Sequence, residues 1–200
     1  MTHLQAEAFI PRSPRAQLLH TCALTDLTEL ARVGFRGSDS AAYLQARGYR
    51  LPSLPNQAVL QADGGWVARL SQTEYLLLGS LADDGTRVAG EEAAWVQDGQ
   101  RNYLLPRQDS HAWLQLSGVH ASAVMAKLCG VDLRAGAFPV GAVAQTSAAR
   151  INVTVVNVGG DQRSTLQLLF DRASLAYLRE AMLDAMDEFN GGWVGVDELM

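Results

Sequence analysis

Hydrophobic positions follow two periods along this chain, which predict short strands alternating with helices. The clearest helix is expected at residues 173–189, where apolar side chains recur at steps of three and four, as in Leu178, Met182 and Met186. The continuous apolar run at residues 75–79 is typical of a strand buried on both faces, and residues 166–170 are expected to form another buried strand.

Shorter patterns, bounded by glycine and proline, predict the remaining elements. Further strands are expected at residues 30–36, 58–61, 66–70, 111–118, 142–147 and 151–158. Further helices are expected after an N-cap at Ser38, at residues 87–96 with Val88, Ala89 and Trp95 packed inward, and at residues 121–129. Pro11 and Pro14 oppose regular structure in residues 1–15, and Gly191-Gly192 is expected to stop the last helix.

The second half of the chain repeats landmarks of the first. The matched positions are Gly37, Gly48, Leu51, Pro55, Ala58 and Gln61 in the first half, and Gly118, Gly130, Leu133, Pro139, Ala142 and Gln145 in the second. The expected division is an N-terminal arm 1–22, a first half 23–97, a linker 98–107, a second half 108–190 and a C-terminal tail 191–200. Because several strands follow one another between helices, the pattern favours an α+β fold with mainly antiparallel sheets.

Composition and charge exclude several classes of partner. The formal net charge is -5 and the basic residues do not cluster, which argues against nucleic acid. No apolar run is long enough to span a membrane, and the N-terminus lacks the apolar core of a signal peptide. Two distant cysteines, Cys22 and Cys129, are typical of free thiols in a reducing compartment. A cytoplasmic protein is expected.

Motifs that carry catalysis or bind metals are missing. The four histidines are scattered without zinc-ligand spacing, and Gly37-Ser38-Asp39 lacks the frame of a nucleophile elbow. The Gly-Gly pairs are expected in turns, since no phosphate-binding glycine pattern surrounds them. No catalytic, cofactor-binding or metal-binding residue is therefore predicted in this chain.

Three stretches carry a resemblance to a known family. Residues 23–44, ALTDLTELARVGFRGSDSAAYL, resemble the opening of the aminomethyltransferase superfamily. Residues 126–133, AKLCGVDL, and 138–146, FPVGAVAQT, followed by Ala149-Arg150, resemble gamma subunits of heterotetrameric sarcosine oxidases. The resemblance covers roughly residues 23–189 and implies the fold of the aminomethyltransferase folate-binding domain.

The resemblance also implies a function. Such gamma subunits are non-catalytic and assemble with an alpha subunit carrying NAD and a folate-type domain, a beta subunit carrying FAD and FMN, and a zinc-binding delta subunit. The complex oxidatively demethylates sarcosine to glycine, with tetrahydrofolate as the one-carbon acceptor. These partners would hold every cofactor, and no cofactor is expected in this chain.

Several alternatives remain. In aminomethyltransferases a Gly-Gly turn precedes a strand with an acidic residue, but residues 66–70 after Gly64-Gly65 contain no carboxylate, which argues against transferase activity. Residues 138–145 lack the lysine and cysteine of folate-dependent iron–sulfur assembly proteins. An equivalent subunit of an N-methylglutamate dehydrogenase-like complex remains open. So does a stand-alone folate-binding or scaffold module that forms homo-oligomers.

Four residues are candidates for a partner interface: Arg150, at the start of a predicted strand, and Trp193, Val194 and Val196 in the tail. Apolar side chains are unusual in a solvated chain end, and tryptophan is enriched at interfaces. The tail either docks on a partner or folds back on its own core. Met182 and Met186 are expected in the core, with a methionine-rich docking surface as the alternative.

Overall fold

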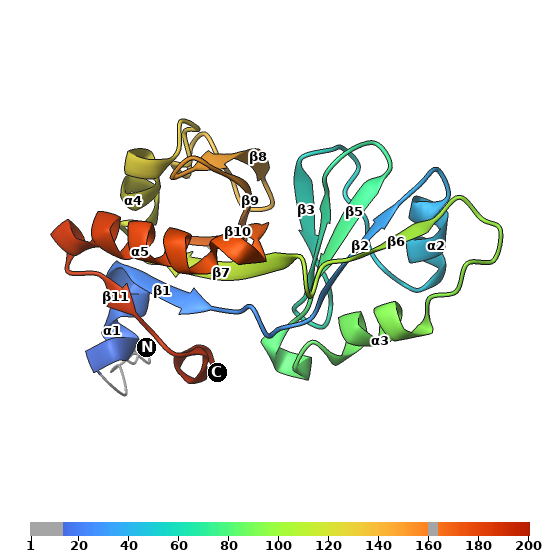
Figure 1. The fold of residues 1–200 in the computed structure, drawn as a ribbon, viewed down its shortest axis with the longest axis horizontal. Helices are drawn as coiled ribbons and strands as arrows, with labels where there is room; N and C mark the ends of the chain where they lie inside the picture. The colour runs from blue at the N-terminus through green and yellow to red at the C-terminus, as the bar shows by residue number, and fades with distance from the viewer. Residues whose placement is uncertain (1–13, 160–163) are drawn as a thin grey trace, which may run out of the picture.

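The computed structural model describes residues 14–159 and 164–200, without the side chains of Pro14 and Ala16. Most of the predicted irregular segment 1–15, and residues 160 and 161 of the predicted turn after the strand at 151–158, lie outside this description. The molecule has two lobes, each made of one sheet and its helices, which lie side by side along its long axis (Figure 1). The predicted α+β class is confirmed.

Five α-helices and eleven strands make up the described residues, with short 3-10 turns between them. The helices are α1 Pro14–Thr21, α2 Ser40–Ala46, α3 Thr86–Ala94, α4 Ala121–Leu128 and α5 Leu175–Met186. The strands are β1 Ala23–Asp26, β2 Arg32–Arg36, β3 Gln57–Leu60, β4 Trp66–Arg69, β5 Glu74–Leu78, β6 Tyr103–Pro106, β7 His111–Ser117, β8 Val143–Ala148, β9 Ile151–Asn157, β10 Thr165–Asp171 and β11 Gly192–Trp193. The 3-10 turns are η1 Leu81–Asp83, η2 Arg172–Ser174, η3 Asp187–Phe189 and η4 Val196–Leu199.

The two sheets share one strand order. The five-stranded sheet runs β3-β4-β5-β2-β6, and the six-stranded sheet runs β8-β9-β10-β7-β1 with β11 added at its edge. Every pair is antiparallel except β1 with β11. The predicted repeat of two similar halves is therefore confirmed at the level of sheet topology.

The halves exchange one strand each. Strand β1 precedes β2 in sequence but pairs with β7 of the second half, and β6 precedes β7 but pairs with β2 of the first half. Residues 98–107, expected as a linker, thus contain a strand of the first sheet. The chain crosses twice between the sheets, once between β1 and β2 and once between β6 and β7 (Figure 1).

The repeated glycines Gly37 and Gly118 sit where an exchanged strand passes. A Cβ on Gly37 would lie 1.9 Å from the carbonyl oxygen of Arg101, just before β6. A Cβ on Gly118 would lie 2.4 Å from the carbonyl of Thr21, just before β1. Both glycines also have positive φ, +148° and +116°, so the same close backbone approach requires glycine at both sites.

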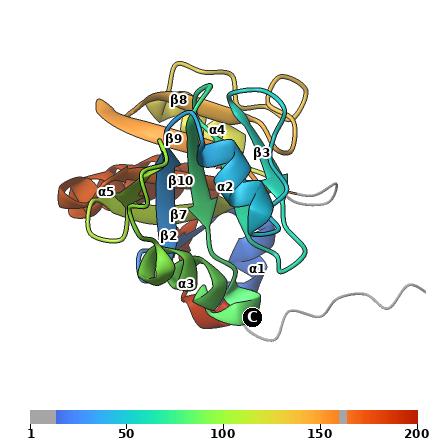
Figure 2. The same ribbon diagram turned by 90° about the vertical axis from the view of Figure 1, so that its right-hand side faces the viewer.

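Four layers result from this arrangement: helices, sheet, sheet, helices. Helices α4 and α5 cover the outer face of the six-stranded sheet, and α2 and α3 cover the outer face of the five-stranded sheet (Figure 2). The inner faces meet in a third apolar cluster. Its buried members are Leu27, Ala68, Leu76, Leu78, Trp113, Val143, Val156 and Leu169.

Some local expectations were wrong, and each has a physical reason. Ser38 does not cap α2; the N-cap position is Asp39, whose carboxylate accepts the backbone N–H of Arg101 at 2.8 Å instead of capping the helix. Ala89 is exposed, because only Val88 of α3 reaches the core. The left-handed residue after α5 is Asn190 (φ 50°) rather than a glycine.

The repeat also differs in detail near the junction of the sheets. Backbone bonds join Ala58 N–H to Gly141 O at 2.6 Å and Val143 N–H to Asn56 O at 3.0 Å. Ala58 therefore corresponds to Val143, one residue beyond the predicted Ala142. The two matched glutamines also form different hydrogen bonds. Gln61 binds the backbone of Arg50, whereas Gln145 binds across the junction of the two sheets, as described below.

Candidate partner-binding surface

The C-terminal tail folds back on its own chain. Gly192 N–H donates to Cys22 O at 3.1 Å and Val194 N–H donates to Leu24 O at 2.9 Å, which makes β11 a parallel neighbour of β1. A Cβ on Gly191 would lie 2.7 Å from the Cys22 sulfur. Glycine at 191 therefore lets the tail pass close to β1.

The side chains of the tail divide into one buried and two exposed residues. Val194 is fully buried against Leu19 and Ala23, so it offers no surface to a partner, and its inclusion among the interface candidates was wrong. Trp193 is 37% exposed and Val196 is 40% exposed. They remain candidates for a partner contact; Trp193 lies in β11 at the outer edge of the six-stranded sheet, and Val196 begins η4.

Arg150 lies elsewhere. It occupies the two-residue turn between β8 and β9 together with Ala149, with φ values of 67° and 47°, and its side chain is exposed. The Tyr177 hydroxyl of α5 donates to Ala149 O at 2.9 Å, whereas Arg179, two residues further along α5, places its guanidinium 5.8 Å from the ring centre of Trp193. The structure therefore does not bring Arg150 together with the tail, since α5 lies between them.

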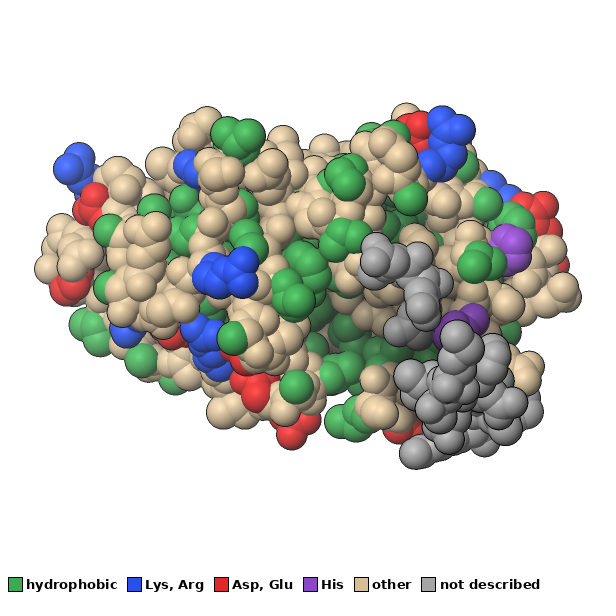
Figure 3. Space-filling model, turned by 180° about the vertical axis from the view of Figure 1, so that it is seen from behind, with side chains coloured by type: hydrophobic (Ala, Val, Ile, Leu, Met, Phe, Trp, Pro, Cys, Tyr) green, Lys and Arg blue, Asp and Glu red, His purple; other side chains and the backbone are tan. Residues whose placement is uncertain are grey.

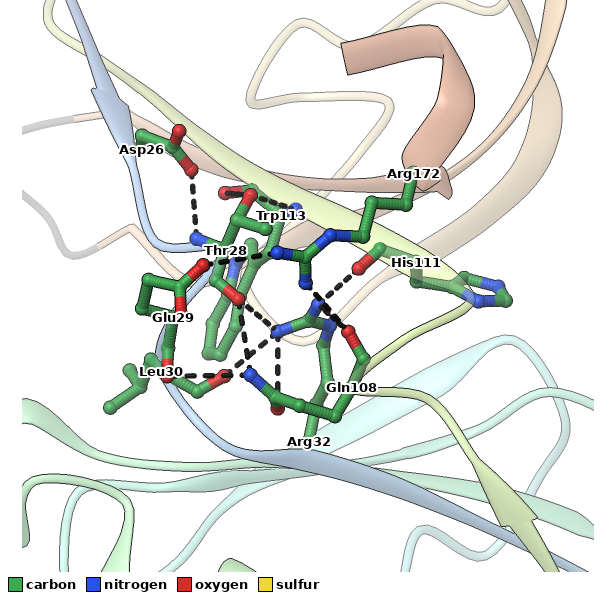
Figure 4. A network of polar contacts seen from close by, with 9 residues as sticks. All are labelled: Asp26, Thr28, Glu29, Leu30, Arg32, Gln108, His111, Trp113 and Arg172. Atoms are coloured by element: carbon green, nitrogen blue, oxygen red, sulfur yellow. Dashed lines mark hydrogen bonds and ion pairs between the residues drawn. The ribbon is translucent and has the colours of Figure 1, made fainter.

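The two crossing segments meet at one buried arginine, which the sequence analysis did not single out. Arg32 is 1% exposed, and its guanidinium donates to the carbonyl oxygens of Thr28 at 2.7 Å and Leu30 at 2.9 Å in the first crossing. It also donates to the carbonyls of Gln108, at 2.9 Å, and His111 in the second (Figure 4). Arg32 is thus a structural clamp between the crossings.

Burial shapes the charges at this clamp. It lowers the pKa of Arg32 to about 10, aided by the nearby charge of Arg172, so the guanidinium stays charged at neutral pH. Burial, with the charges of Arg107 and Arg32, also lowers the pKa of His111 to about 4, so that this imidazole is neutral. Its Nδ1 lies 2.8 Å from the Ser110 hydroxyl. Of these groups, Arg32 holds the backbone of both crossing segments.

Strand β4 follows Gly64-Gly65, where the resemblance to aminomethyltransferases implies a strand with an acidic residue. Its polar side chain is Arg69, which donates to the carbonyls of Ser53 at 2.6 Å and Gln72 at 2.8 Å. A shallow groove of about 460 Å³ lies nearby, where residues 51–59 meet residues 139–142. The Gln145 side-chain amide of β8 donates hydrogen bonds to Asn56 Oδ1 and to the carbonyl oxygen of Leu70. These hydrogen bonds join the two sheets.

Other features of the described residues concern the core, metal binding and the outer surface. Met182 and Met186 are fully buried, so they belong to the core and not to a docking surface. No three His, Cys, Asp or Glu side chains in residues 14–159 and 164–200 are grouped to hold a metal ion. Within the same ranges, no helix has the length and hydrophobicity to cross a bilayer. On the rear face, hydrophobic side chains gather along the middle, with charges of both signs around them (Figure 3).

Comparisons with known proteins identify relatives of this chain. No protein-family model matches it. It is 28% identical to a sarcosine oxidase subunit gamma of Arthrobacter sp. over 170 residues, which cover 83% of this chain and 80% of that protein. It is 29% identical to a sarcosine oxidase subunit gamma of Corynebacterium sp. (strain P-1) over 174 residues, which cover 84% and 82%.

Solved structures agree with this relationship. A chain of the heterotetrameric sarcosine oxidase from Corynebacterium sp. U-96, in complex with pyrrole 2-carboxylate, superimposes with a TM-score of 0.67 and 25% identity over 86% of this chain and 87% of that one. The glycine cleavage system aminomethyltransferase T from Bartonella henselae superimposes with a TM-score of 0.64 and 15% identity over 90% of this chain and 50% of that one, which shows a shared fold. The chain is a homologue of sarcosine oxidase gamma subunits and has the fold of the aminomethyltransferases.

Proposed function

We propose that this chain is the non-catalytic gamma subunit of a heterotetrameric sarcosine-oxidising enzyme. The observation that carries the proposal is its similarity to two sarcosine oxidase gamma subunits over about four fifths of their lengths. In this role alpha, beta and delta subunits are its partners, and they supply FAD, FMN, NAD, zinc and the tetrahydrofolate site. The chain itself supplies a rigid body on which these subunits assemble in the cytoplasm.

The disposition of reactive side chains supports this role. The guanidinium groups of Arg32 and Arg69 are bonded to backbone carbonyls, and burial keeps the His111 imidazole neutral. Strand β4 offers no carboxylate to act on an amine. Exposed apolar side chains remain at the tail, namely those of Trp193 and Val196. Large apolar side chains at a sheet edge suit protein contacts better than turnover of a small molecule.

Co-expression with the flavin-bearing and zinc-binding subunits of the same genome tests the proposal. A tagged chain is expected to retain the flavin subunit through purification, and the complex is expected to release peroxide with sarcosine while the chain alone does not. Parallel assays with N-methylglutamate show whether the complex belongs to the sister class of dehydrogenases. Failure of any flavin subunit to co-purify with the intact chain would refute the subunit assignment.

The tail provides a matched pair of variants. Replacing both Trp193 and Val196 by serine truncates side chains that are 37% and 40% exposed, so we expect weaker assembly together with some loss of unfolding free energy in the isolated chain, because their buried parts are removed as well. Val194→Ala instead removes buried methyl groups, so we expect a loss of about 2 kcal/mol in the isolated chain and unchanged assembly of the folded protein. The reverse pattern would show that the tail serves only the fold.

A further inference from the structure

The two exchanged strands, β1 and β6, occupy equivalent positions. Ala23 of β1 pairs with Ser117, one residue before Gly118, and Tyr103 of β6 pairs with Arg36, one residue before Gly37. The flanking bonds repeat as well, since Thr21 O accepts from His120 N–H and Arg101 O accepts from Asp39 N–H, each at 3.1 Å. Ala23 therefore corresponds to Tyr103 and Leu24 to Leu104.

The outer edge of β1 is covered by the chain's own tail. The N–H groups of Gly192 and Val194 donate to the outward carbonyls of Cys22 and Leu24. The Val194 side chain lies over Ala23, which is fully buried. The segment that does this is short, since β11 has two residues and Val194 directly follows it. A short extended segment is thus enough to complete the six-stranded sheet.

The corresponding edge of β6 has no such cover. No strand among residues 14–159 and 164–200 pairs with it, and the five-stranded sheet ends there. By the equivalence above, the outward groups of this edge are the carbonyl of Asn102 and the N–H and carbonyl of Leu104. Tyr103, at the position of the buried Ala23, is 51% exposed. An exposed aromatic side chain and unpaired backbone groups together are the features that strand addition uses.

We propose that β6 accepts a short extended segment of a partner subunit as a sixth strand. The segment runs parallel to β6, as β11 runs parallel to β1, and donates N–H groups two residues apart to the carbonyls of Asn102 and Leu104. It places an apolar side chain over Tyr103, in the way that Val194 covers Ala23. The proposal rests on the proposed function, because it needs a partner chain in a complex.

Amide exchange on the whole complex tests this directly. The Leu104 amide points outward in this geometry, so its exchange is expected to slow by about tenfold or more when the chain joins the complex. Unchanged exchange at Leu104 in an assembled complex overturns the proposal and leaves the subunit assignment intact. Protection of the same amide in the isolated chain that grows with protein concentration also overturns it, because the occupant is then a second copy.

A proline variant with a matched control separates strand addition from packing. Leu104→Pro removes the outward N–H and leaves the β2 ladder in place, since an edge strand tolerates proline where its N–H faces outward. Leu104→Ala truncates the same side chain and keeps the N–H. We expect the proline variant to assemble at least about tenfold more weakly than the alanine variant at similar melting temperature; equal assembly overturns the proposal. If the proline variant does not fold, the exchange experiment on the wild-type complex decides. A wild-type chain that retains no flavin subunit removes both the subunit assignment and this inference.

Discussion

Replacing Arg32 by methionine is the sharpest test of how the two halves are joined. The guanidinium donates to carbonyl oxygens of both crossing segments, at 2.7 Å to Thr28 and at 2.9 Å to Leu30 and to Gln108, and also to His111 O. Methionine fills a similar apolar volume but donates no hydrogen bond. The variant therefore keeps most of the packing and removes the polar clamp.

The magnitude follows from two opposing terms. Four carbonyls lose a donor, and each buried unsatisfied group costs about 1–3 kcal/mol, less where water can enter. Against this, methionine avoids the burial of a cation. The pKa of Arg32 is lowered from 12.5 to about 10, which corresponds to a cost of about 3 kcal/mol that the variant no longer carries. Because the carbonyls cannot be removed with the arginine, we expect a net loss of about 3–5 kcal/mol.

Urea unfolding of the isolated chain measures this loss. Arg32→Lys keeps a charge but cannot reach both crossings with one planar fork, so an intermediate loss is expected. Arg36→Met is the matched control, since that side chain is 66% exposed and its ion pair with Glu74 is 3.9 Å long. The control is expected to change the unfolding free energy by less than about 0.5 kcal/mol. A loss below about 1 kcal/mol for Arg32→Met would show that the crossings hold without the clamp.

Two further predictions concern backbone space and acid. Gly118→Ala should destabilise the chain by about 2–4 kcal/mol in urea unfolding, because the added Cβ would lie 2.4 Å from the Thr21 backbone and φ at this residue is +116°. Gly130→Ala is the control, since a Cβ there would have nothing within 4 Å, and it should change the unfolding free energy by less than about 0.5 kcal/mol. Equal effects of the two variants would contradict the argument. His111 has a folded pKa of about 4 against an ordinary 6.5, so the unfolded chain binds the extra proton and stability falls as pH drops through that window, by on the order of 2 kcal/mol after solvent screening. His111→Asn should flatten this decline between about pH 7 and about pH 4.5, and an unchanged slope would assign the acid sensitivity to other groups.

The sequence predicts the elements that carry their own periodic pattern. Helix α5 and the buried strands β5 and β10 were located from apolar spacing, and the repeat of Gly37 and Gly118 predicted two similar halves. The exchange of β1 and β6 could not be predicted in this way, because the glycine spacing is the same whichever sheet each strand joins. Only the pairing with a distant strand distinguishes the two arrangements.

Two of the missed strands, β6 and β11, share a physical cause. Strand β6 follows a polar stretch and ends in proline, and β11 has two residues, so neither shows alternation long enough to detect. The turn at Ala149-Arg150 adopts positive φ without glycine or asparagine, and thus lacks the usual residue signature. An apolar tail residue such as Val194 is equally compatible with self-docking and partner docking, since hydrophobicity alone does not choose the surface that buries it.

Reciprocal exchange of strands has a consequence for assembly. Each sheet is completed by a strand from the other half of the chain, and one arginine clamps both crossings, so relative motion of the halves would break backbone ladders as well as the shared apolar cluster. A body of this kind loses little conformational freedom when partners bind, which lowers the entropic cost of assembly. Among residues 14–159 and 164–200, the two outer edges differ, because β11 pairs along one and no strand pairs along the other, at β6. If the chain acts as the proposed subunit, it contributes through rigidity, and the edge at β6 is where we propose that a partner segment binds.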